Sequence, residues 1–429
     1  MERTSLVRQI GVAFCGRTVT GMTTAGPAAP RQASDWDSQT SPSTDRWAGK
    51  PGIVLSGAGL IAALLGSQTI AASTPLGSDV RLLLPSEGLL AGLGDGLRRG
   101  YGLAMEESAW CGARPPSLQL GWLPPGADPR PALRHTPRSA LLVAPAAAPL
   151  KPYGELAEQQ RISVLLPLQR GRSLEGLPQL RGADRLWPIV PARSLEADRL
   201  AEALLAEGIQ RVMVVRDPSA ESRALSDRFV ASFRMGKGTL VGVSEEPISL
   251  DGRDKKARDQ LVDDVDWYRP AALVVLTAPS STVAARIRQA DWPEGLILAW
   301  PFRAGQPLEQ PQLSIDPQSR GKGWKAFARQ FERRWGYTPG LVESAGYDTG
   351  LIAAIAAVPV QAKAGWDLQW FNPRARPLPL CEALQQRRQG AALRPQAATS
   401  RLDQSAGISP GAELRIRRVA ARQAAPPPS

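Results

Sequence analysis

The sequence predicts an α/β protein built from two doubly wound lobes. Short apolar runs alternate with amphipathic helical segments along most of the chain, which is the order of elements in a parallel sheet. The runs are hydrophobic throughout rather than alternating, as in parallel strands that are covered by helices on both faces. There are too many strand–helix units for one sheet of ordinary width, so two sheets are expected.

The predicted strands are rich in Leu, Val, Ile and Ala, and the first of them stops at Pro85. Such runs, bounded by polar residues, Gly or Pro, are typical of buried strands. They cover residues 80–84, 118–122, 140–143, 162–166, 212–215, 271–276 and 296–300, with a late strand within 413–419.

Helices are predicted between these strands from apolar residues at helical spacing. The segment 195–207 has Ser194 as its expected N-cap and Gly208 just past its end, and a further helix covers about 221–235. The first helix of the body is indicated by residues that recur on one face, namely Leu93, Leu97, Tyr101, Ala104 and Met105.

An aromatic stripe marks one later helix. Trp324, Phe327, Phe331 and Trp335 fall on a single helical face. Such a stripe serves either as core or as a stacking surface for a ligand, and its spacing favours the core interpretation.

The formal net charge is +12, carried mainly by Arg residues that are scattered and have acidic neighbours. No basic stripe interleaved with aromatic residues is present, so nucleic acid is not an expected partner. The chain has three cysteines and one histidine. The spacing of Cys15, Cys111 and Cys381 matches no zinc pattern and His135 stands alone, so no metal or other cofactor is expected.

Two alternatives remain open for the later cysteines. Cys111 and Cys381 either form a disulfide in an oxidising compartment or stay as buried free thiols, and the second is the simpler expectation.

The N-terminal region has the layout of an export signal. Lys50 precedes an apolar run at 51–66 and a small-residue exit at 67–73, so residues 51–73 are expected to be a signal peptide cleaved after Ala71 or Ala72, or else an N-terminal anchor. Residues 1–50 read as a low-complexity leader and 420–429 as a disordered tail. The expected location is therefore periplasmic or otherwise extracytoplasmic.

Several segments together resemble the type I periplasmic binding proteins, the branched-chain amino-acid receptor group of ABC transporters. Residues 327–339, ending Trp-Gly-Tyr-Thr-Pro, precede a Gly-Tyr-Asp that opens an apolar helix at 344–356. Residues 190–217 resemble the group's first crossover into its second lobe, and 82–88 its first strand and loop. The resemblance spans about residues 79–419.

This resemblance implies two lobes joined by three crossovers, with residues 79–190 and 300–375 in the N-terminal lobe and 191–299 and 376–419 in the C-terminal lobe. It implies a non-enzymatic, monomeric solute-binding protein that delivers a small polar or amino-acid-like solute to a membrane permease. The solute would bind at strand ends between the lobes, which close on it by a hinge motion.

Candidate contacts to the solute follow from that geometry. Amino-acid binders of this group usually carry Ser or Thr after the third strand, but the loop 144–149 has no hydroxyl, so only its backbone amides can serve. Asp217 either partners a ligand amine or caps the next helix, whereas Tyr347 and Asp348 are expected to be a buried structural pair. The full set of candidates is Ser86, Glu87, Ala146, Ala147, Asp217, Thr277, Ser280 and Trp300.

Enzymatic alternatives find little support. Gly94, Gly96 and Gly100 imitate a dinucleotide-binding loop, but they begin about nine residues after Pro85, whereas that turn should follow its strand directly. His135 lies in a Pro/Arg-rich loop without an evident partner for nucleophilic catalysis. The remaining alternative is an envelope scaffold or regulator that reuses the fold without a transported ligand, suggested by the hydroxyl-free loop and the basic surface.

Overall fold

The computed structural model describes residues 79–421, except 89, 135–138, 303–307 and 317–319. The predicted leader, the signal segment and almost all of the tail lie outside the described residues, as do Cys15 and His135. None of the helices within the described residues combines the length and the apolar composition needed to cross a membrane.

The first sheet has five parallel strands in the order β2-β1-β3-β4-β5. This is one of the common orders of doubly wound folds, in which the winding direction reverses between β1 and β3. The strands are β1 (Val80–Pro85), β2 (Leu118–Leu123), β3 (Leu141–Val143), β4 (Ser163–Leu166) and β5 (Leu186–Pro188).

Both faces of this sheet are buried, which explains its continuous apolar runs. Leu82 and Leu84 belong to a core shared with the helices on one face, whereas Leu83 packs with α3 on the other. The helices of this lobe are α1 (Ala91–Trp110), α2 (Pro129–Leu133), α3 (Leu150–Gln160), α8 (Trp324–Trp335), α9 (Leu341–Ala356) and α10 (Leu380–Arg388), with a small pair of strands, β12 (Pro377–Leu378) and β13 (Arg394–Pro395).

The second sheet repeats the same winding. Its order is β14-β11-β10-β9-β6-β7, with β8 also paired to β6, and only β14 runs antiparallel to its neighbour. The reversal of winding here falls between β6 and β9. The strands are β6 (Arg211–Arg216), β7 (Thr239–Leu240), β8 (Ile248–Ser249), β9 (Ala272–Leu276), β10 (Ile297–Trp300), β11 (Gln312–Asp316) and β14 (Arg415–Val419).

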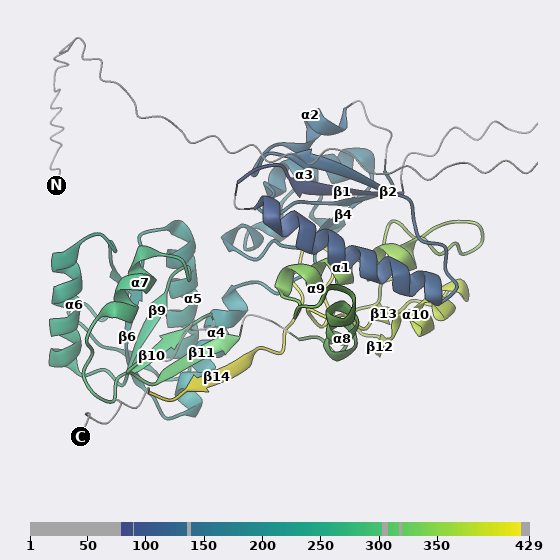
Figure 1. Cartoon of the computed structure of the whole chain (residues 1–429). Coiled ribbons are helices and arrows are strands. Elements are labelled where there is room, and N and C mark those ends of the chain that lie inside the picture. The colour runs from purple at the N-terminus through teal and green to yellow at the C-terminus, as the bar shows by residue number, and fades with distance from the viewer. Residues whose placement is uncertain (1–78, 89, 135–138, 303–307, 317–319, 422–429) are drawn as a thin grey trace, which may run out of the picture. The chain divides into compact units, whose positions relative to one another are not determined.

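Alternate residues of β6 face opposite layers. Val212 and Val214 pack with α4 (Ser194–Ala206) and α5 (Ala220–Met235), and Met213 and Val215 pack with α6 and α7. The bounds of these last helices are Lys255–Tyr268 and Thr282–Gln289. Helices therefore cover both faces of the sheet (Figure 1), and the predicted doubly wound α/β architecture is confirmed.

The chain passes between the two sheets three times, as the resemblance implies. The first crossover follows β5 and leads to α4, the second joins β11 to α8, and the third joins β13 to β14. The predicted lobe boundaries need correction at two places. β11 pairs with β10 in the second sheet, and α10 packs in the core of the first. β11 escaped prediction because Gln312 and Ser314 interrupt its apolar residues, although both are buried.

One predicted cap is also corrected. Ser194 is the first residue of α4 rather than its N-cap, and the N-cap position is occupied by Arg193 without a side-chain hydrogen bond. The hydroxyl of Ser194 is therefore not used by the helix end.

The glycines that imitate a dinucleotide-binding loop lie inside α1, where Gly94 faces β1 and Gly96 and Gly100 let α9 approach. A Cβ added to Gly100 would lie 1.8 Å from the backbone oxygen of Glu343, and one added to Gly346 would lie 2.1 Å from that of Leu97. Hydrogen is the only side chain that fits at such a helix crossing. Helix packing thus accounts for Gly96 and Gly100.

The aromatic stripe of α8 is core, as its spacing predicts. Phe327 and Phe331 are fully buried, and the ring of Phe327 lies 4.8 Å from that of Tyr347 on α9.

Cys111 and Cys381 form a disulfide that joins the end of α1 to α10. This replaces the simpler expectation of two free thiols.

Candidate functional site

Most of the predicted site residues follow strands at which the winding of a sheet reverses, one such place in each sheet. Ligands of open α/β sheets bind at the carboxyl ends of strands where the winding reverses. In the first sheet Ser86 and Glu87 follow β1, and Ala146 and Ala147 follow β3. In the second sheet, Asp217 follows β6, and Thr277 and Ser280 follow β9. The topology therefore groups these residues at the two reversal points.

At the second reversal point Asp217 and Thr277 are in direct contact. Thr277 is fully buried and its hydroxyl donates to a carboxylate oxygen of Asp217, while the backbone N–H of Ser219 donates to the other oxygen at 2.9 Å. Partial burial acts to raise the pKa of Asp217, but the hydrogen bonds from Ser219 and Thr277 outweigh it and hold the pKa below its usual value. Asp217 is therefore ionised at neutral pH.

These bonds give Asp217 a structural task as well. It orders the turn that leads to Ser219, whose hydroxyl accepts the N–H of Ser222 at 3.2 Å and caps α5. Asp217 itself was considered from the sequence as the cap of this helix, but the N-cap is Ser219, and Asp217 orders the turn before it. A bond from Asp217 to a ligand amine is untested and is taken up below.

The loops of the first reversal point differ in exposure. Ser86 and Glu87 are exposed, Ala146 is buried, and Ala147 is exposed with a left-handed backbone at φ 59°. Ser280, at the second reversal point, is exposed as well.

Trp300 requires a correction, because the sequence placed it at the ligand site. Its side chain is fully buried in the core between the second sheet and α6 and α7, 5.4 Å from the ring of Phe302. The guanidinium of Arg288 lies 5.2 Å from its ring. The last residue of β10 points toward the helix layer, so Trp300 is a core residue.

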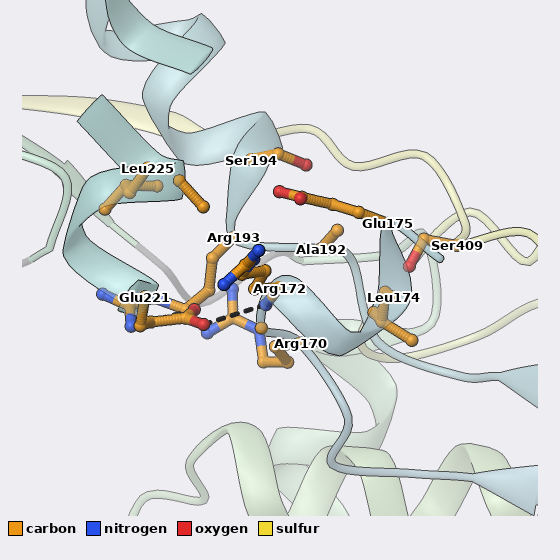
Figure 2. Close-up of a pocket in the computed structure, with 12 residues that line it drawn as sticks. Arg170, Arg172, Leu174, Glu175, Ala192, Arg193, Ser194, Glu221, Leu225 and Ser409 are labelled. Atoms are coloured by element: carbon orange, nitrogen blue, oxygen red, sulfur yellow. Dashed lines mark hydrogen bonds and ion pairs between the residues drawn. The ribbon is translucent and has the colours of Figure 1, made fainter. Parts of the chain in front are cut away.

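A cavity of about 180 Å³ is lined by residues of both lobes (Figure 2), and none of the contacts predicted from the sequence is among them. The first lobe contributes the loop after β4, and the second contributes the starts of α4 and α5. The lining residues are Arg170, Gly171, Arg172, Leu174, Glu175, Ala192, Arg193, Ser194, Glu221, Ala224, Leu225 and Ser409.

The charge of one arginine in the cavity is balanced by a buried carboxylate of the same protein. Arg170 forms an ion pair with Glu196 of α4, whose side chain is only 2% exposed, and its Nε donates to the backbone oxygen of Pro191 at 3.0 Å. The buried carboxylate of Glu196 requires a charged partner, and Arg170 supplies it. Through Glu196 and Pro191, Arg170 holds the loop after β4 to α4 and to the first crossover.

Glu221 links the two lobes across the cavity. Its carboxylate accepts the backbone N–H of Arg172 at 2.9 Å, drawn as a dashed line in Figure 2, and lies 3.6 Å from the guanidinium of Arg193. Gly171 makes this approach possible, since a Cβ there would lie 2.9 Å from both carboxylate oxygens. The start of α5 is thereby held to the loop after β4.

Several polar groups of the cavity have no partner among the described residues. The guanidinium of Arg172 and the hydroxyl of Ser194 make no ion pair or hydrogen bond there, and the buried hydroxyl of Ser409 has none either. The carboxylate of Glu175 makes no hydrogen bond or ion pair within that part of the chain, although its charge helps to raise the pKa of Arg228. The cavity thus offers hydrogen-bond donors to an anionic group and one carboxylate to a cationic group.

Sequence reasoning missed this set of residues because they form no motif. Arg172, Arg193, Glu221 and Ser409 come from separate parts of the chain and meet only in the folded protein. The one available signal was the resemblance of residues 190–194 to a crossover. Within the described residues, no group of three or more His, Cys, Asp or Glu is placed to hold a metal ion.

Comparisons with known proteins give a consistent result at the level of fold. No protein-family model matches the chain, and no curated protein matches its sequence. The structure is similar to an ABC transporter substrate-binding protein from Desulfitobacterium hafniense in complex with Leu, with a TM-score of 0.54 and 15% identity over 79% of this chain and 96% of that one.

Two further solved structures show the same similarity. A solute-binding protein of an ABC transporter from R. palustris, in complex with benzoate, has a TM-score of 0.51 and 16% identity over 80% of this chain and 93% of that one. A branched-chain amino acid ABC transporter periplasmic ligand-binding protein from Burkholderia xenovorans has a TM-score of 0.53 and 12% identity over 65% of this chain and 77% of that one. The described chain therefore has the fold of the type I periplasmic binding proteins.

Proposed function

We propose that this protein is an extracytoplasmic solute-binding protein of an ABC-type transporter, acting as a monomer and not as an enzyme. The observation that carries the proposal is the cavity lined by both lobes, in which the donor groups of Arg172, Ser194 and Ser409 have no partner among the residues that the structure describes. The fold supports it, because proteins of this architecture include transporter receptors for small solutes. The disulfide between Cys111 and Cys381 suits an oxidising compartment outside the cytoplasm.

The chemistry of the cavity selects a small solute with a carboxylate or a similar anionic group. Arg172 supplies a guanidinium that pairs well with a carboxylate, and the hydroxyls of Ser194 and Ser409 supply neutral donors. Glu175 in the cavity provides a carboxylate for an amine, and Asp217, which follows β6, is a second candidate. Leucine and benzoate, which are bound by similar structures, both carry a carboxylate.

Solute binding works by closing the lobes around the hinge formed by the crossovers. A ligand shifts such an equilibrium only through contacts that differ between the open and closed states. Glu221 makes this kind of contact already, since it joins α5 to the backbone of Arg172. A solute that binds Arg172 from one lobe and Ser194 from the other adds to the same contact and favours the closed state.

The test is a thermal-shift screen of the purified protein against amino acids, amides, urea-like compounds and small carboxylates. At least one carboxylate solute is expected to raise the melting temperature in a saturable way. Arg172→Gln should lower the affinity of the protein for that solute about tenfold or more. Arg253→Gln, which removes the same charge from an exposed site outside the cavity, should leave its affinity unchanged.

The absence of any thermal shift would favour the alternative of an envelope scaffold or regulator. The specific observation behind that alternative is the loop 144–149, which carries no hydroxyl at the first reversal point. Affinity capture from membranes separates the two functions. A transporter permease as the captured partner supports the receptor, and capture of other envelope proteins alone contradicts it.

A further inference from the structure

A second cavity, of about 250 Å³, is lined by residues of the second and third crossovers. The second crossover contributes Arg320, Gly321 and Lys322. The third contributes the segment from Ala397 to Asp403 together with Glu413, and Arg394 of β13 adjoins it. The cavity described above shares no residue with this one.

The lining of this second cavity is rich in positive charge. Arg320, Lys322, Arg394 and Arg401 face two carboxylates, Asp403 and Glu413, which leaves a net charge of +2. One of the carboxylates is already engaged. Asp403 lies 3.5 Å from the guanidinium of Arg401 and accepts the backbone N–H of Gly411 at 2.8 Å.

Two of the arginines have buried nitrogen atoms that are not satisfied. The Nε atoms of Arg320 and Arg394 are shielded from solvent and have no hydrogen-bond partner among the described residues. An unsatisfied buried donor destabilises the folded protein, and it does so more strongly when it belongs to a charged group. Arg320 is held over the ring of Trp324, with its guanidinium carbon 5.2 Å from the ring centre.

Backbone hydrogen bonds hold the segments that carry these side chains. The N–H of Gly321 donates to the oxygen of Ala398 at 2.9 Å, and the N–H of Arg401 donates to that of Gly411 at 3.1 Å. Gly321 permits the close contact, because a Cβ there would lie 2.3 Å from the oxygen of Ala397. The two crossovers therefore present their cations from a packed framework.

We propose that this cavity is a binding site for a small dianion, such as inorganic phosphate or a short dicarboxylate. A dianion matches the net charge of the lining, and the cationic groups of Arg320, Lys322, Arg394 and Arg401 supply donors for its oxygens. By binding residues of two crossovers at once, the ion joins them and stabilises the folded protein. The site is independent of the solute cavity and of the function proposed for it.

Titration of the full chain with sodium phosphate, followed by calorimetry and by melting temperature, tests the site. Sodium chloride and sodium acetate at matched ionic strength serve as monoanion controls. Phosphate and malonate are expected to bind saturably and to raise the melting temperature, whereas chloride and acetate should produce no saturable change. Binding of this kind stabilises the folded state according to the occupancy of the site.

Variants locate the site. Arg394→Gln and Lys322→Gln should each lower the affinity for phosphate about tenfold or more. Arg374→Gln, which removes an exposed charge outside the cavity, should leave that affinity unchanged. Lys322→Gln keeps the test decisive if Arg394→Gln does not fold. Equal effects of phosphate and acetate, or equal phosphate affinity in Lys322→Gln and Arg374→Gln, would overturn the proposal.

Discussion

The carboxylate of Asp348, in the middle of α9, accepts the backbone N–H of Ala398 at 2.6 Å and that of Thr399 at 2.8 Å. Asp348 is fully buried, so these two bonds fasten the third crossover to the core of the first lobe. Its neighbour Tyr347 donates to Glu107 of α1 at 2.6 Å. The sequence-based expectation of a buried structural pair at these positions is confirmed.

Asp348 should make stability depend on pH. Burial raises its pKa from 3.8 to about 7, against the lowering effect of the N–H groups of Ala398 and Thr399. Between about pH 4 and about pH 7 the folded state keeps a proton that the unfolded chain has released, so the free energy of unfolding falls as pH rises through this window. The contribution is fully present below about pH 4.

The measurement is urea denaturation of the protein and of Asp348→Asn across that range. The asparagine does not titrate, so the difference in unfolding free energy between the two proteins should shrink by a few kcal/mol as pH rises from about 4 to about 7. A difference that stays constant with pH would show that Asp348 keeps its ordinary pKa.

The crossing of α1 and α9 should not tolerate a methyl group. Gly100→Ala places a Cβ against the backbone oxygen of Glu343, and the expected loss of stability is about 3 kcal/mol or more. Gly102→Ala on the same helix meets nothing within 4 Å and should instead raise stability by about 0.5–1 kcal/mol through helix propensity. Thermal unfolding of both variants separates packing from propensity, and equal effects would contradict the contact.

The disulfide should contribute to stability because it closes a loop of 270 residues in the unfolded chain. Replacement of both Cys111 and Cys381 by serine is expected to lower the free energy of unfolding by about 3 kcal/mol. A reducing agent should lower the melting temperature of the native protein and leave that of the double variant unchanged. A shift of the same size in both would show that the bond does not form.

The ion pair of Arg170 with Glu196 should matter far more than a surface pair of the same helix. Glu196→Gln leaves the largely buried Arg170 without its carboxylate, and the expected cost is about 3 kcal/mol. Glu202 of α4 pairs with Arg199 at 2.9 Å but is 64% exposed, so Glu202→Gln should change stability by less than about 0.5 kcal/mol. Denaturation of the two variants provides the comparison, and similar losses would argue against the buried pair.

The strands of both sheets were largely predictable because burial on two faces leaves a local signal. The apolar run at 80–84 became β1 and that at 271–276 became β9, each within a residue or so of its observed end. The glycines of α1, in contrast, gave a misleading local pattern. They imitated a nucleotide-binding loop, and only the contact of Gly100 with Glu343 shows that helix packing requires them.

The candidate site was predictable only in part. Asp217 and Thr277 could be placed at strand ends from the sequence, but their hydrogen bond depends on β6 and β9 being neighbours. Trp300 was misplaced because the sequence does not show which face of β10 it occupies. The cavity around Arg172 and Glu221 could not be anticipated at all.

By itself, the sequence determined the alternation of strand and helix, the doubly wound class and the aromatic core stripe, since these follow from periodicities a few residues long. The tertiary structure alone decided that β11 joins the second sheet, that Cys111 meets Cys381, and that Glu221 reaches the loop after β4. Such contacts bring together residues far apart in the chain. Whether they form depends on the free energy of the whole packed protein, which no local pattern encodes.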